Sequence, residues 1–126
     1  MPTSRSEWDA LLAKYPAHVQ ELAAETKRVI LATLSKPTEQ VDTKANVVGY
    51  GFGAGYNNLI CTIIFSKTGV KLGLAGGATL PDPKKLLEGT GKVHRYVQIS
   101  APADARRPAV KALLKAGVAE WKIKTG

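Results

Sequence analysis

The 126 residues carry a net charge of +8, and with 44% hydrophobic and 22% charged residues they have the composition of one folded domain rather than a disordered chain. No apolar run approaches the ~20 residues that cross a bilayer, and the N-terminal residues lack the apolar segment of a secretory signal. Since Cys61 is the single cysteine, an internal disulfide is excluded, and we expect one cytoplasmic domain over residues 1–126 with no membrane association.

Two helices are predicted in the first third of the chain. Ser6 is a candidate N-cap for a short helix, which ends near Tyr15 because a residue before proline avoids helical geometry. A longer helix then runs from Pro16 to about Leu34, since its apolar residues recur at the spacing of one helix face. These residues are Val19, Leu22, Ala23, Val29 and Ile30.

The polar stretch 39–46 is predicted to be a connection, and the next stretch, 47–53, is predicted to be a strand. Alternation places Val48, Tyr50 and Phe52 on one face of this strand and three glycines on the other. A bare glycine face suits either a closely packed helix or a ligand. Both interpretations remain open at this point.

The strongest predicted strand covers residues 59–65 and is apolar on both faces, which is typical of a central position in a sheet. Cys61 lies in the middle of this strand without a charged neighbour in sequence, so we expect an inert core thiol. A hairpin turn follows at residues 66–69, with Gly69 expected in the left-handed conformation. The next strand, 70–74, then directs Lys71 and Gly73 away from the core.

Residues 75–97 combine glycine steps, a proline turn and a basic entry into a last strand. Asp82 and Pro83 predict the start of a short helix, and Gly89 is expected at its left-handed end. From Val93 onward alternation places Arg95 with the apolar positions and His94 on the opposite face. A charge at the edge of an apolar face needs a partner, and either an acidic side chain (Glu88 or Asp82) or an anionic ligand would supply one.

The segment 89–92, Gly-Thr-Gly-Lys, resembles part of a phosphate-binding loop but lacks its defining features. A nucleotide-hydrolase loop needs a glycine where Leu86 stands, a hydroxyl residue where Val93 stands, and a helix after the lysine. A looser site remains open, because backbone N–H groups in glycine turns bind anions beside basic side chains. The alternative is a tight connection with solvated charges.

A closing helix is predicted from Pro108, with Asp104 as a candidate cap. Its apolar stripe consists of Val110, Leu113, Leu114, Val118 and Trp121. The order of elements and the short connections predict an α+β fold: a two-layer sandwich with an antiparallel sheet of four to five strands and the N- and C-terminal helices on one face. The other sheet face would then be half polar, with Lys71, Gly73, His94, Tyr96 and Gln98 on it and Tyr50 as a further candidate.

One string in the chain resembles the YdhG-like family of small, mostly bacterial domains of largely unknown function. The string is Gly-Gly-Ala-Thr-Leu-Pro-Asp-Pro at 76–83, followed by Leu-Leu-Glu-Gly at 86–89, Gly-Lys at 91–92 and Arg95. The resemblance covers roughly residues 39–121 and implies a frataxin-like shape. One branch of the family is described as an intracellular iron chaperone, although a fold does not carry its function with it.

The whole net charge lies in residues 67–126, which hold twelve basic and four acidic side chains, whereas residues 46–66 hold no charge. Such an excess raises affinity for anions. We therefore predict a binding or interaction module for an anionic small molecule or an acidic protein partner. The candidate binding residues are Lys71, Lys92, His94 and Arg95, with Lys84 and Lys85 steering the ligand.

Three alternatives belong to other classes. The family resemblance implies iron delivery, for which Glu21 and Glu25 are the candidate ridge, but ten scattered carboxylates argue against it. Nucleic-acid binding is open to a basic chain, although aromatic residues are not interleaved with the basic ones. An enzyme is not expected, since no paired carboxylate or activated nucleophile is visible, and neither is a cofactor.

Overall fold

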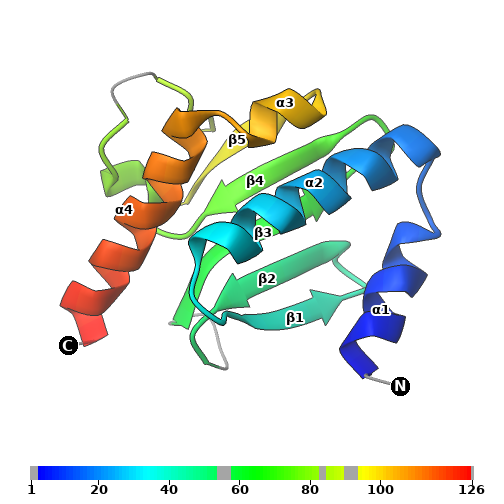
Figure 1. Cartoon of the computed structure of the whole chain (residues 1–126), viewed down its shortest axis with the longest axis horizontal. Helices are drawn as coiled ribbons and strands as arrows, with labels where there is room; N and C mark the ends of the chain where they lie inside the picture. The colour runs from blue at the N-terminus through cyan, green and yellow to red at the C-terminus, as the bar shows by residue number, and fades with distance from the viewer. Residues whose placement is uncertain (1–2, 54–57, 83–84, 90–93, 126) are drawn as a thin grey trace.

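A computed structural model describes residues 3–53, 58–82, 85–89 and 94–125 of the chain (Figure 1). The helices are α1 (Thr3–Leu12), α2 (Ala17–Thr33), the short 3-10 helix η2 (Gly77–Thr79), α3 (Pro102–Ala105) and α4 (Pro108–Thr125). The strands are β1 (Thr38–Asp42), β2 (Val47–Gly51), β3 (Leu59–Phe65), β4 (Val70–Leu74) and β5 (Arg95–Ile99).

The five strands form one antiparallel sheet in the order β1-β2-β3-β4-β5, so that each strand pairs with its neighbour in sequence. β3 is central, as predicted from its two apolar faces. The register aligns Val48 with Ile63 and Ile63 with Leu72, which places the apolar positions of neighbouring strands side by side. The predicted two-layer α+β architecture is confirmed.

Helices α2 and α4 lie on the same face of the sheet, and the hydrophobic core lies between them and the strands (Figure 1). Trp8 of α1 is buried against Phe65, with the ring centroids 6.1 Å apart in an edge-on arrangement. Gly117 lets α4 approach the sheet closely, since a Cβ atom there would lie 3.3 Å from Ile60 Cγ2. The predicted apolar stripes of both long helices therefore cover the sheet.

A partly buried polar contact links α2 to the edge of the sheet. The Tyr50 hydroxyl donates to Glu39 Oε2 at 2.6 Å, and Lys27 Nζ lies 2.9 Å from the same oxygen and 4.2 Å from the centre of the Trp8 ring. Burial, followed by the bond to Glu39, raises the pKa of Tyr50. Tyr50 is fully buried on the helix-covered face, so its assignment to the uncovered face was wrong.

The prediction that residues 39–46 form a connection was wrong for their first half, which is strand β1. The strand is polar because it lies at the sheet edge, where only β2 pairs with it. Its half-buried acidic group, Glu39, is paired with Tyr50 and Lys27. A polar edge strand and a loop look alike in sequence, and only the turn at 43–46 is a true connection.

Two predicted end positions also differ from the structure. Helix α1 begins at Thr3, so Ser6 lies within it and is not its N-cap. Gly69 does not have positive φ; the predicted hairpin turn closes instead through Ser66, whose N–H donates to Gly69 O at 3.0 Å and whose Oγ accepts the Gly69 N–H at 3.2 Å. The hydrogen bond to the Ser66 hydroxyl thus closes the turn, and a left-handed glycine is not needed.

The short helix predicted after Asp82 is absent from the described residues 85–89. The Asp82 carboxylate accepts the N–H groups of Leu86 and Leu87 at 2.9 Å each, and Glu88 then pairs with Tyr96 through backbone bonds of 2.7 and 3.1 Å. The chain therefore becomes an edge partner of β5 where a helix turn was expected. Gly89 has the predicted positive φ, at 107°, while Pro83 and residues 90–93 lie outside the described residues.

The buried contact at Glu39 leads to a stability prediction. Replacing Glu39 by alanine leaves the Tyr50 hydroxyl buried without its acceptor, which costs about 1–3 kcal/mol of unfolding free energy. The matched control is Glu21→Ala on the exposed side of α2, with an expected change within about 0.5 kcal/mol. Urea denaturation of both variants measures the difference, and equal stabilities would contradict a structural role for the Tyr50–Glu39 bond.

Candidate ligand-binding face of the sheet

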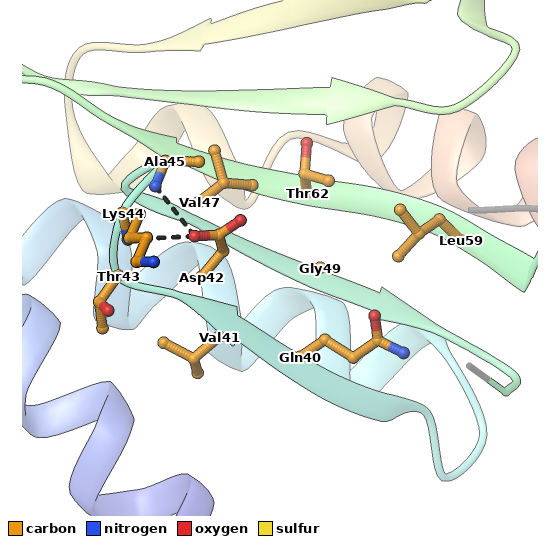
Figure 2. A pocket seen from close by; sticks show the side chains of 10 residues that line it. All are labelled: Gln40, Val41, Asp42, Thr43, Lys44, Ala45, Val47, Gly49, Leu59 and Thr62. Atoms are coloured by element: carbon orange, nitrogen blue, oxygen red, sulfur yellow. Dashed lines mark hydrogen bonds between the residues drawn. The ribbon is translucent and has the colours of Figure 1, made fainter. Parts of the chain in front are cut away.

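The second face of the sheet lies opposite the helices, and we call it the open face. Figure 2 shows part of it, with α2 behind the strands. Two rows of cross-strand neighbours run over this face from β1 to β5. The first row consists of Gln40, Gly49, Thr62, Gly73 and Tyr96, and the second consists of Asp42, Val47, Ile64, Lys71 and Gln98.

Glycines make the first row low. Gly49 and Gly73 stand on either side of Thr62, so that Thr62 alone raises a side chain over the three central strands of this row. A Cβ atom at Gly49 would lie 2.7 Å from Leu59 Cδ2, and one at Gly73 would collide with Thr62 Oγ1. Of the two interpretations of the glycine face at residues 47–53, a packed helix is therefore wrong, because Leu59 lies against Gly49, and Asn58 lies against Gly51 and Gly53.

One hollow of about 390 Å³ lies at the β5 end of the open face, and we call it the basic-end hollow. Its floor is apolar, with Leu59, Ile64 and Gly73, and His94, Arg95 and Tyr96 line its far end. Lys71 stands beside it, with Nζ 4.5 Å from the centre of the Tyr96 ring. The arrangement combines an apolar surface with cationic and hydrogen-bonding groups at one end.

The backbone defines the hydrogen-bonding state of His94. Its Nδ1 accepts the Gly76 N–H at 3.2 Å, and Gly76 itself holds a left-handed φ of 70°. A neutral imidazole that accepts at Nδ1 carries its proton on Nε2 and donates from there. The exposed His94 therefore offers a donor, which is the group that an anion requires.

A second hollow, of about 610 Å³, lies at the β1–β2 hairpin, and we call it the hairpin-end hollow (Figure 2). Asp42 lines it, but the Asp42 carboxylate already accepts the N–H groups of Lys44 and Ala45 at 3.0 and 2.9 Å. Lys14, in the turn that follows α1, supports the hairpin by donating to Thr43 O at 3.0 Å and to Asn46 Oδ1 at 2.7 Å. The polar groups of this turn are therefore hydrogen-bonded to one another and to Lys14.

The structure places two of the six predicted binding residues in the basic-end hollow and a third beside it. His94 and Arg95 line the hollow, and Lys71 reaches the ring of Tyr96 at its rim. Lys84 and Lys92 lie outside the described residues, and Lys85 is exposed with a φ of 54°. The proposed pairing of Arg95 with Glu88 or Asp82 stays a prediction.

The residues proposed for iron stand on α2. Glu21 is exposed, whereas Glu25 is paired with Arg28 and with Arg106, whose Nη1 lies 3.2 Å from Glu25 Oε2. The hydrogen bond from Arg28 is the main cause that lowers the pKa of Glu25, and Arg106 adds to it. In the described part of the chain no group of three or more His, Cys, Asp or Glu residues is placed to hold a metal.

Cys61 is fully buried in the core, and burial raises the pKa of its thiol. A thiol that stays protonated is a poor nucleophile, which agrees with the prediction of an inert core residue.

The floor of the open face and its hairpin end were not predicted from the sequence. Val47, Leu59 and Ile64 were assigned to strands but not to a site, because an apolar residue in a strand is normally interpreted as core. The available signal was the alternation of Gly49 with Val48 and Tyr50, which predicted a bare face. The pairing of Gly49 and Gly73 across Thr62 depends on strand register and is not visible in the sequence.

Comparisons with known proteins add no identification. A scan against protein-family models, a search of curated proteins and a search of solved structures each found no match. The YdhG-like resemblance accordingly stays a prediction. None of the helices in the described residues has the length and apolar character to span a bilayer.

The glycine row leads to a prediction about stability. Gly73→Ala is expected to lower the unfolding free energy by about 1–3 kcal/mol, because the new methyl group collides with Thr62 Oγ1 on a β-branched, rigid side chain. In a Thr62→Ala background the same substitution should cost at least about 1 kcal/mol less, since residues in contact are not additive. A double-mutant cycle by urea denaturation measures the coupling, and purely additive costs would contradict the contact.

Proposed function

We propose that this chain is a binding domain for an organic anion that has an apolar body, and that it binds the anion on the open face at the basic-end hollow. One observation carries the proposal: His94 and Arg95 line the end of a hollow whose floor is apolar, and Lys71 holds its ammonium group over the ring of Tyr96, which lines the same end. Its volume of about 390 Å³ falls within the range of roughly 300–1,000 Å³ that is typical of small-molecule sites. A carboxylate or a phosphate is the class of anion that fits.

Each polar group has a role in this proposal. Lys71 supplies positive charge, and its contact with the Tyr96 ring holds the ammonium group at the rim of the hollow. His94 donates from Nε2, because its Nδ1 is occupied by the Gly76 N–H. Arg95 follows His94 in the sequence and contributes to the positive potential at the same end.

The surroundings strengthen the attraction for anions. Residues 67–126, which include β4 and β5, hold twelve basic and four acidic side chains. An excess of this kind steers anions toward the surface and raises their association rate at low ionic strength. An acidic protein partner would use the same charges, but a hollow with an apolar floor favours a small molecule, which buries its body there.

Isothermal titration with octanoate tests the proposal, with octanamide as the uncharged analogue. Octanoate should bind and octanamide should bind more weakly, and the octanoate affinity should fall as salt is added. Lys71→Gln and His94→Gln should each weaken octanoate binding about fivefold, the equivalent of ~1 kcal/mol for a partly exposed charged contact.

Lys67→Gln is the matched control, since Lys67 is an exposed lysine of the β3–β4 turn and does not line the hollow. Its octanoate affinity should equal that of the unchanged chain. Equal binding of octanoate and octanamide, or equal losses in the Lys67 and Lys71 variants, would reject an anion site at the basic-end hollow.

A further inference from the structure

The two hollows of the open face are continuous. Val47, Leu59 and Thr62 line both of them, so the basic-end hollow passes into the hairpin-end hollow over β3. The combined depression runs across the strands along the row that contains Gly49, Thr62 and Gly73. We call this depression the trough.

The composition of the trough floor departs from that of a sheet face in water. An antiparallel sheet with one solvated face normally alternates apolar residues toward the core with polar residues toward solvent. Here the outward positions of β2 and β3 are Val47, Gly49, Leu59, Thr62 and Ile64, and residues 46–66 carry no charged side chain. An uncovered apolar surface of this kind indicates a binding site.

The charged and hydrogen-bonding side chains of the trough are confined to its ends. At the β5 end His94 and Arg95 line the hollow and Lys71 lies over the Tyr96 ring, and at the β1 end stand Asp42 and Lys44. The Asp42 carboxylate is already engaged by two backbone N–H groups of its own turn. A matching ligand is therefore anionic at one end and uncharged along the rest of its length.

The register of the sheet gives the length of that ligand. Tyr96 at the basic end and Gly49 at the hairpin-end hollow are three strands apart in the same row. Neighbouring strands lie ~4.8 Å apart, so the apolar path from Tyr96 to Gly49 measures about 14 Å. The path is narrow, because Leu59 flanks it on one side and the row of Val47 and Ile64 flanks it on the other.

The shape of the trough favours one flexible acyl chain as its occupant over a second copy of the protein. Two copies that met through this face would have to fill hollows of about 390 and 610 Å³ with side chains of two equally shallow surfaces. Unfilled apolar space forfeits dispersion contacts and is destabilising. A flexible acyl chain fills such a space, and its carboxylate complements the positive end.

We infer that the ligand is a long-chain fatty acid, which lies across the strands with its carboxylate at Lys71 and His94 and its acyl chain along the trough over Gly73, Thr62 and Gly49. This inference rests on the proposed function and adds the ligand class and its direction. The basic end binds the carboxylate, and the uncharged floor favours an apolar acyl chain. A free carboxylate is therefore necessary, and chain length sets the affinity.

Titration with saturated carboxylates from butyrate through octanoate and dodecanoate to palmitate, each below its micelle concentration, measures the contribution of the trough. Each added methylene should raise the affinity about twofold, because full burial of a methylene gives about fourfold and the trough is open on one side. The gain should level off once the chain exceeds the path of about 14 Å.

Two pairs of variants test whether the acyl chain lies in the trough. Ile64→Asn and Leu59→Gln should each remove most of the chain-length gain while leaving the affinity for butyrate unchanged. Their controls are Ile123→Asn on α4 and Leu31→Gln on α2, which make the same changes at exposed residues of the opposite layer and should keep the full gain. Far-UV circular dichroism checks that each variant is folded. If Ile64→Asn does not fold, the comparison of Leu59→Gln with Leu31→Gln still gives the test.

The outcomes separate this inference from the proposed function. Carboxylates that bind with one affinity at every length would overturn the fatty-acid assignment and leave the anion site standing. A chain-length gain that persists in both floor variants would also overturn it. Carboxylates that bind at no length would reject both, and so would a ligand-independent dimer in sedimentation that Ile64→Asn dissociates.

Discussion

The structure depends on the contact between the side chains of β3 and the two glycines that flank them on the open face. Gly49 and Gly73 leave room for Leu59, Thr62 and Ile64 to lie low against the sheet. β3 is apolar toward both faces; α2 and α4 cover one of them, and the other stays shallow and without charge over β2 and β3. The candidate site exists because the helices cover only one face of the sheet in the described residues.

The buried interactions of the domain support this view of its two faces. On the helix side the large apolar side chains of the described strands are buried, and Tyr50, Glu39 and Lys27 form a polar contact at its edge. On the open side the side chains of β2 and β3 are only partly covered, although they are no more polar. For β2 and β3 the difference between the two faces lies in what covers them rather than in their polarity, which is why we infer a ligand for the open face.

Periodicity predicted the fold well where it was strong. The stripes of α2 and α4 and the two apolar faces of β3 gave the layers and the centre of the sheet, and the short links gave the antiparallel order. Local signals were less reliable: the polar edge strand β1 resembled a loop, and Asp82 with the following proline resembled a helix start. In the first case pairing with β2, and in the second case pairing of Glu88 with Tyr96, overrode the local preference. The basic end of the site was predicted because charge is visible in sequence, whereas the floor needed the register.

The most direct test of the central claim is methyl NMR of the chain titrated with dodecanoate. If the open face binds the acyl chain, the methyl signals of Val47, Leu59, Thr62 and Ile64 should shift together and saturate at one equivalent. Those of the helix-covered core, such as Val19, Leu22 and Leu114, should stay in place. Shifts confined to the core residues, or shifts spread evenly over both faces, would contradict the account.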